Sequence, residues 1–295
     1  MEWQTVRLAD GRELDVLAGA GGSTRGLLFH HGTPGNATRF ETWFAAAEQR
    51  GLRPVAYSRP GYATSSRDPG RTVASVAADA SELLDQLGIE EFVTLGGSGG
   101  GPHSIASAAL LPDRCLASAA LVTVAPWQAD GLDWMAGMTA LNVDEFSAAL
   151  AGEGALREWM AGFGEEVRQI TAKQMIATLG DALPPVDQAI ATGEWAEHEA
   201  GGLRRALEHG FDGWVDDDLA FAEPWGFDVE SIRVPVHIWQ GELDRLVPWS
   251  HGQWLADHIP GATFTLARGH GHFSLGAANR DEILDDLVTA AGPSR

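Results

Sequence analysis

One serine of the chain lies within a run of glycines that could present it as a nucleophile. From Phe92 to His103 the sequence reads FVTLGGSGGGPH, which fits the pattern G-x-S-x-G around Ser98. This pattern is typical of a tight turn from a strand into a helix, where the residues two before and two after the serine must be small. Gly96 and Gly100 hold those two positions. The run therefore predicts that Ser98 is a nucleophile at the end of a strand.

Other uses of a glycine run fit these residues less well. A dinucleotide-binding G-x-G-x-x-G pattern that begins at Gly97 would need a glycine where Pro102 stands, and a phosphate-binding loop would need a lysine after the glycines. A glycine-rich turn without chemistry is the remaining alternative. The strand predicted before Ser98 and the helix predicted after it favour the nucleophile.

The sequence resembles the α/β-hydrolase superfamily over most of the chain outside a predicted lid. Besides the glycine run, the stretch HGTPG at residues 31–35 is similar to the family's H-G-x-P loop, and residues 58–65 are similar to its D-x-x-G-x-G-x-S turn. The resemblance implies that the backbone N–H groups of Thr33 and Gly99 form an oxyanion hole. It also implies an α/β fold with a mostly parallel, eight-stranded sheet flanked by helices and an inserted α-helical lid.

A serine hydroxyl is a poor nucleophile at neutral pH, so the chain must also supply a base and an acid that orients the base. The stretch GELDRLVP resembles the family's G-x-x-D-x-x-V-P motif and implies Asp244 as the acid. The stretch GHF resembles the family's G-H-F motif and implies His272 as the base. Glu242 and His270, each two residues away, are the local alternatives. The order serine, aspartate, histidine that starts at Ser98 is the order expected of this fold.

These residues imply acyl transfer in two steps, in which Ser98 attacks a carbonyl and water then hydrolyses the acyl-enzyme. We therefore predict a serine hydrolase that acts on a small, neutral or cationic carboxylic ester or lactone and needs no cofactor. The dehalogenase and epoxide hydrolase branches of the family would need an aspartate at position 98. No metal site is predicted, because the two histidines of the HGH stretch lack a third ligand.

Two other functions stay open from the sequence. Proline iminopeptidases resemble the chain in the H-G-x-P-G loop and use lid carboxylates to hold a substrate's amino terminus. The candidates for that role here are Glu194, Glu197, Asp216, Asp217, Asp218 and Glu223. Those enzymes have a tryptophan after the serine, however, where this chain has Gly99. The other alternative is a non-catalytic receptor that binds a small hydrophobic ligand on the same fold.

Short apolar runs predict the strands that would position these residues. Runs without alternation are typical of strands buried on both faces of a parallel sheet, whereas alternating apolar and polar residues predict an edge hairpin with one solvated face. The hairpin is predicted at residues 3–8 and 13–18, and the buried strands at 26–30, 54–57, 92–95, 116–124, 234–239 and 263–267. Helical periodicity predicts helices at 73–87 and 249–258 and a final helix that includes residues 283–288.

About a hundred residues interrupt this alternation of strands and helices. Residues 1–125 and 231–295 are predicted to form the core, and residues 126–230 a helical lid with short helices at 144–151, 165–179 and 194–208. The lid leaves and re-enters the sheet at strand ends, where ligands bind in open α/β sheets, so we expect it to select the substrate and to contribute little to the chemical step. Candidates to line an apolar acyl pocket beneath it are Trp127, Trp134 and Trp225.

Composition narrows the class of partner. The 295 residues include 41 acidic and 20 basic ones, and residues 126–230 carry 21 of the acidic but only five of the basic residues. A surface this acidic repels nucleic acid and anionic membranes, which leaves a small-molecule substrate as the predicted partner. Cys115 is the only cysteine, so no intramolecular disulfide is possible. The sequence has neither an apolar run of roughly 20 residues nor a signal-peptide pattern, so a cytoplasmic location is expected.

Overall fold

The computed structural model describes residues 1–180 and 183–293. In that part of the chain one sheet of eight strands has the order β1-β2-β4-β3-β5-β6-β7-β8. Strands β1 and β2 form the predicted antiparallel hairpin, and β2 pairs antiparallel with β4. All further neighbours pair in parallel, so the sheet is mostly parallel, as the sequence predicted. The strands are β1 (Glu2–Arg7), β2 (Glu13–Ala18), β3 (Arg25–His30), β4 (Arg53–Tyr57), β5 (Glu91–Gly97), β6 (Cys115–Leu121), β7 (Val236–Gly241) and β8 (Thr263–Ala267).

The apolar core lies on both faces of the sheet. Along β3, Leu28 packs into one cluster while Leu27 and Phe29 pack into another, because successive side chains of a strand point to opposite faces. The helices on the first face are α2 (Val76–Gln86), α3 (Gly101–Leu110) and α10 (Ser250–His258), and those on the second are α1 (Phe44–Glu48) and α11 (Ser274–Ala291). Short 3-10 helices are η1 (Ala37–Trp43), η2 (Val73–Ser75), η3 (Ser98–Gly100) and η5 (Val229–Ser231). Because helices cover both faces of the sheet, apolar and polar residues do not alternate along the central strands.

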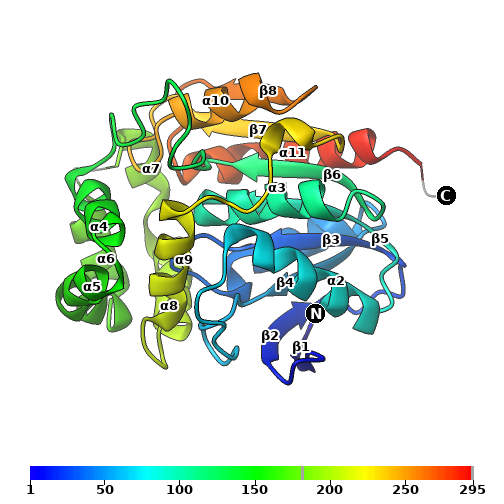
Figure 1. Ribbon diagram of the computed structural model, residues 1–295, viewed down its shortest axis with the longest axis horizontal. Coiled ribbons are helices and arrows are strands. Elements are labelled where there is room, and N and C mark those ends of the chain that lie inside the picture. The colour runs from blue at the N-terminus through cyan, green and yellow to red at the C-terminus, as the bar shows by residue number, and fades with distance from the viewer. Residues whose placement is uncertain (181–182, 294–295) are drawn as a thin grey trace.

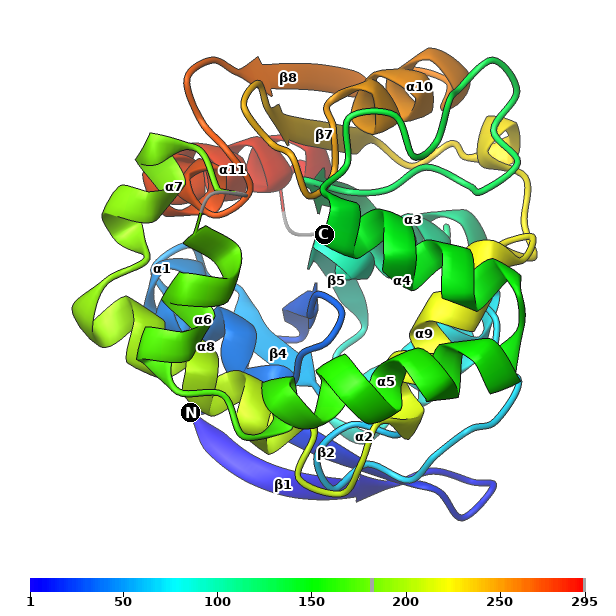
Figure 2. The ribbon, with the colours of Figure 1, turned by 90° about the vertical axis from the view of Figure 1, so that its left-hand side faces the viewer.

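Six α-helices of the described residues lie between β6 and β7 in the sequence, and we call them the α4–α9 segment. They are α4 (Ala140–Leu150), α5 (Glu153–Arg168), α6 (Ala172–Leu179), α7 (Pro185–Ile190), α8 (Gly193–Ala206) and α9 (Asp212–Ala222). Figure 1 shows them gathered at one end of the sheet, on the side to which the arrows of β6 and β7 point. Figure 2 views the molecule from that side and shows α4, α5, α6 and α8 in front of the sheet. Among the described residues, no helix is both long enough and apolar enough to cross a membrane.

Two predictions of secondary structure were wrong, and some helices were missed, among them α9. Strand β2 is not an edge of the sheet, because it lies between β1 and β4 with five of its six residues buried. The helix predicted over residues 165–179 is two helices, because Thr171 starts a new one by accepting a hydrogen bond from the backbone N–H of Gln174. Helix α9 was missed, because aspartates in succession at 216–218 are typical of a solvated stretch, although here all three are buried.

Candidate active site

Ser98 lies at the turn between strand β5 and helix α3. Its φ of +53° is in the left-handed region, which is uncommon for a residue with a side chain and is typical of a serine presented at a strand end. A Cβ on Gly96 would clash with the backbone of Gly100, and a Cβ on Gly100 would clash with the backbone of His30. Only glycine fits at these two positions, which is the physical reason for the G-x-S-x-G pattern.

Asp244 and His272 come together from two loops at the same end of the sheet. Asp244 follows strand β7, His272 precedes helix α11, and Asp244 Oδ2 lies 2.8 Å from His272 Nδ1. The other carboxylate oxygen of Asp244 accepts hydrogen bonds from the backbone N–H groups of Leu246 and Val247, each at 2.9 Å. These bonds fix the carboxylate. Because Nδ1 of His272 is bound to this carboxylate, Nε2 is the ring nitrogen that is left to face the cavity.

Two neighbouring cavities, the wider lobe and the narrower lobe, share Ser98 in their walls. Their volumes are about 530 Å³ and about 210 Å³. Ser98 and His272 line both lobes, although no hydrogen bond joins the two side chains in this structure. Hydrogen bonds of this kind often tighten only when a substrate binds. The residues that line both lobes are Gly32, Arg39, Ser98, Trp195, Glu199, His272 and Phe273, and Arg39 forms an ion pair with Glu199.

The narrower lobe is mainly apolar where the α4–α9 segment forms its wall. Its apolar residues from that segment are Leu141, Phe163, Val167, Ile170, Met175, Trp195, Leu203 and Trp214. Glu145 also lines it, and burial raises the pKa of this carboxyl to about 7, although a hydrogen bond from Trp214 opposes the shift. Trp214 Nε1 donates that bond to Glu145 Oε1 at 2.6 Å. Two carboxyls line this mainly apolar lobe: Glu199 is paired with Arg39, and Glu145 is the one whose charge changes near neutral pH.

The loop that carries Thr33 lies beside Ser98. A Cβ on Gly32 would lie 3.4 Å from Ser98 Cβ, and the Thr33 side chain packs so closely on Gly99 that a Cβ there would clash with it. Among the described residues, the backbone N–H of Thr33 has no hydrogen-bond partner. A free N–H group in this place is available to a negatively charged oxygen on a substrate.

The two local alternatives lie away from the cavity. His270 lines neither lobe, and its carbonyl oxygen accepts a hydrogen bond from the backbone N–H of Leu243 at 2.8 Å. Glu242 also lines neither lobe, and its Oε2 accepts a hydrogen bond from the backbone N–H of Gly269 at 3.0 Å. Of the two histidines and two carboxylates, the structure therefore brings only His272 and Asp244 together.

The three tryptophans expected to line an acyl pocket lie elsewhere. Trp134 packs against Trp127 and His251, and its Nε1 donates a hydrogen bond to the carbonyl of Ala125 at 2.7 Å. Trp225 belongs to the apolar core on the α2–α3 face of the sheet. All three fill space between elements, as tryptophans of a core do. The tryptophans that do line the lobes are Trp43, Trp195 and Trp214, and no sequence signal separated them from the other eight.

The six carboxylates that the sequence offered for binding a substrate's amino terminus have different surroundings. Asp216 pairs with Arg67 at 2.8 Å and Asp217 with Arg59 at 2.6 Å, so both are neutralised by arginines from the loop after β4. Burial, and then the charge of Glu145, raise the pKa of Asp218 well above its usual range. Of the six candidates, only Glu194 lines a lobe that reaches Ser98.

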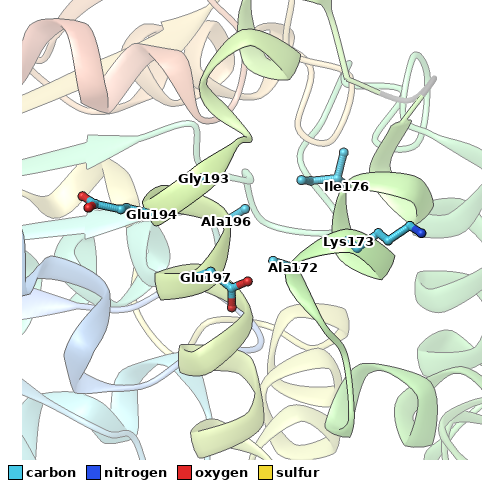
Figure 3. Close-up of a pocket in the computed structure, with 7 residues that line it drawn as sticks. All are labelled: Ala172, Lys173, Ile176, Gly193, Glu194, Ala196 and Glu197. Carbon is cyan, nitrogen blue, oxygen red and sulfur yellow. The ribbon is translucent and has the colours of Figure 1, made fainter.

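A further hollow, separate from the two lobes, lies on the α4–α9 segment between helices α6 and α8. Its residues are Ala172, Lys173, Ile176, Gly193, Glu194, Ala196 and Glu197. Figure 3 shows Glu194 and Lys173 pointing in opposite directions, away from the space between the two helices. The hollow includes none of Ser98, Asp244 and His272, so we regard the two lobes as the candidate site. In the described part of the chain, no group of three or more histidine, cysteine and acidic side chains is arranged to hold a metal ion.

Comparisons with known proteins give the same family that the sequence motifs resemble. The family described as "alpha/beta hydrolase fold" matches residues 27–276. A "Non-heme haloperoxidase" of Rhodococcus erythropolis is 30% identical over 294 residues, which cover 96% of this chain and 97% of the relative. An "Uncharacterized hydrolase YcgS" of Bacillus subtilis (strain 168) is 23% identical over 270 residues, or 88% of this chain and 92% of the relative. The solved structure of an alpha/beta hydrolase fold protein from Nakamurella multipartita is 25% identical with a TM-score of 0.67, and the match covers 99% of this chain and 100% of that one.

Proposed function

The chain belongs to the α/β-hydrolase family, and from this premise we propose that it is a serine hydrolase of a small, neutral or cationic carboxylic ester or lactone. The observation that carries the proposal is the 2.8 Å contact between Asp244 Oδ2 and His272 Nδ1 at the wall of a cavity that Ser98 also lines. A hydroxyl, an imidazole and a buried carboxylate are the groups that acyl transfer needs. The hydrolase name of the Bacillus subtilis relative supports the same class of reaction.

The proposed reaction begins when Ser98 Oγ attacks the carbonyl carbon and His272 Nε2 takes the hydroxyl proton. Asp244 keeps a proton on Nδ1 and stabilises the imidazolium that forms, while the N–H groups of Thr33 and Gly99 hold the negative oxygen. His272 then gives its proton to the leaving oxygen, the bond between carbonyl carbon and leaving oxygen breaks, and the acyl group stays on Ser98. Water, deprotonated by His272, then attacks the acyl carbon. The bond between this carbon and Ser98 Oγ breaks, His272 returns the proton to Oγ, and the acid is released.

The carbonyl group of such a substrate would lie at Ser98, with the acyl portion in one lobe and the alcohol portion in the other. The narrower lobe, with its apolar wall from α4, α5, α6, α8 and α9, suits a short acyl chain. The wider lobe, which Glu194 and His198 also line, suits a larger and more polar alcohol portion. In the wider lobe, Arg39 offsets the charge of Glu199 but not that of Glu194, and the Glu194 carboxylate disfavours a negatively charged substrate. This supports a neutral or cationic ester.

In this proposal residues 126–230 act as the lid and residues 1–125 with 231–295 as the core. The narrower lobe supports the division, because side chains of the α4–α9 segment form its apolar wall while Ser98, Thr33 and His272 come from the core. Substrate choice then depends mainly on the lid, and the reacting groups come from the core.

A substrate panel tests the proposal. Wild-type protein and Ser98→Ala are assayed with p-nitrophenyl esters of increasing acyl length, with simple lactones and with aminoacyl naphthylamides. We expect the wild type to turn over short esters or lactones and Ser98→Ala to lose that turnover. Turnover confined to aminoacyl naphthylamides would replace the proposal by an aminopeptidase. Ester binding without turnover would replace it by a receptor.

A further inference from the structure

A buried carboxylate of helix α9, that of Asp217, contacts the core beside the candidate site. Asp217 is 0% exposed and lines neither lobe, so it does not touch a substrate that binds there. His103 Nε2 from α3 lies 3.6 Å from its Oδ1. Four side chains lie closer to its carboxylate oxygens: Arg59 (Nε at 3.1 Å, Nη2 at 2.6 Å), Arg71 (Nη2 at 2.6 Å), Tyr62 (hydroxyl at 2.8 Å) and Thr33 (Oγ1 at 2.6 Å). All four belong to core loops that follow β3 and β4. Burial alone would raise the pKa of Asp217, but the adjacent charges of Arg59 and Arg71 outweigh it and hold the pKa well below its usual range.

Arg59 connects this carboxylate to the loop at residues 31–33. Asp217 holds the guanidinium by two hydrogen bonds, from Nε and from Nη2, and such a fork fixes the plane of the group. The fixed guanidinium donates to the carbonyl oxygen of His31 and, through Nη2 at 3.1 Å each, to the carbonyl oxygen of Gly32 and to Thr33 Oγ1. The carbonyl oxygens of His31 and Gly32 are thereby held by one buried side chain, that of Arg59, which is 1% exposed.

Holding the carbonyl of Gly32 also sets the direction of the next N–H group. A trans peptide unit is planar, and its C=O and N–H bonds point in opposite directions. The Gly32 carbonyl is fixed by Arg59 Nη2 at 3.1 Å and by His31 Nδ1 at 2.7 Å. The N–H on the opposite side of that peptide is the one of Thr33, which has no partner among the described residues and lies in the loop beside Ser98.

We propose that Asp217 is a positioning residue for the oxyanion hole at Thr33. The inference rests on the proposed function and adds to it. Asp217 acts through Arg59 on the peptide plane and through Thr33 Oγ1 on the same residue's side chain, so it keeps the N–H directed at the negative oxygen of the transition state. One residue of the α4–α9 segment then contributes to the chemical step, to which the lid was expected to contribute little.

The test compares Asp217→Asn with Asp216→Asn in the full-length protein. Asp216 is a matched control, because it precedes Asp217 on α9, is 3% exposed and pairs with Arg67 through bonds of 2.9 and 2.8 Å, but lines neither lobe. Loss of one oxyanion donor costs about 10² to 10³ in kcat, so a misdirected donor in Asp217→Asn should cost about 10- to 100-fold with KM changed less than about threefold. The rate of labelling by a fluorophosphonate should fall in parallel. Asp216→Asn should keep kcat within about threefold of the wild type, even where its melting temperature falls.

Each outcome decides for or against the inference. An equal loss of kcat in the two variants, or a rise of KM with kcat unchanged in Asp217→Asn, overturns it. Where Asp217→Asn does not fold, Tyr62→Phe decides, because this change removes one hydrogen bond to Asp217 and keeps the ring. A fall of kcat in Tyr62→Phe without a change of KM supports the inference, and an unchanged kcat overturns it. Absence of turnover and labelling in the wild type is a different result, which overturns the proposed function itself.

Discussion

The carboxylate of Asp187 accepts a hydrogen bond from the backbone N–H of Ser274 at 2.9 Å and a second from Phe273 at 3.3 Å. Asp187 lies on α7, whereas Ser274 begins α11 directly after the His272 loop. A negative group at a helix N-terminus satisfies N–H groups that have no partner within the helix. The Trp195 ring from α8 also packs against Phe273, with 5.2 Å between ring centroids. The α4–α9 segment therefore holds the loop that positions His272.

We predict that Asp187→Ala lowers the free energy of unfolding by about 1–2 kcal/mol, the usual cost of a lost cap. Asp187→Asn should recover part of this loss, because the amide oxygen of asparagine still accepts a hydrogen bond. Denaturant unfolding monitored by circular dichroism gives both values. Equal midpoints for the wild type and Asp187→Ala would show that the contact does not stabilise α11.

We predict that His272→Ala lowers kcat by at least about a thousandfold and His270→Ala by less than about tenfold, since loss of the base leaves only the oxyanion hole and substrate binding. The structural reason is that His272 contacts Asp244 and lines both lobes, whereas His270 does neither. Steady-state kinetics with the best ester of the panel measures both effects. The reverse ranking would make His270 the base.

We predict that Glu145→Gln is more stable than the wild type by about 1 kcal/mol at pH 8, with the difference shrinking as the pH falls towards 5. Burial raises the pKa of Glu145 to about 7, so between its ordinary value and 7 the folded state keeps a proton that the unfolded chain has released. Stability of the wild type therefore falls as the pH rises through this range. Urea unfolding at several pH values measures the difference. The exposed Glu166, changed to Gln, is the control, and identical pH profiles for the two variants would contradict the prediction.

We predict that a cationic ester has a higher kcat/KM than a neutral ester of equal size and that the ratio shrinks with salt. The Debye length falls from about 10 Å at 0.1 M to about 3 Å at 1 M, so a preference that comes from the acidic field is screened. A preference that does not depend on salt would indicate a direct ion pair with one carboxylate, and Glu194→Gln in the wider lobe would then remove it. No preference at any salt concentration would make the acidity a feature of solubility alone.

The sequence predicted most reliably what depends on local geometry. The turn at Ser98 was predictable because the close approach of Gly96 and Gly100 leaves no room for a side chain. The residues that meet this constraint are consecutive in the sequence and can therefore be recognised there. The pairing of Asp244 with His272 was predictable because the resemblance fixed both positions relative to strand ends. The catalytic roles of these residues stay predictions until they are measured.

Contacts between distant segments were not predictable from the sequence. From the charge count alone, residues 126–230 would form a uniformly acidic surface. In the structure, however, Asp216 and Asp217 are buried against arginines about 150 residues earlier in the chain. No pattern in one sequence specifies such partners. For the same reason Trp214 could not be told from Trp134, because only the placement of α9 brings Trp214 to the narrower lobe.

The most direct test of the account is intact-mass spectrometry after reaction with an active-site-directed fluorophosphonate, followed by peptide mapping. Only a hydroxyl that a neighbouring base activates reacts readily with such a reagent. We predict a single adduct on Ser98 in the wild type, no adduct in Ser98→Ala and strongly slowed labelling in His272→Ala. No adduct on the folded wild-type protein, or an adduct on a serine other than Ser98, would contradict the account.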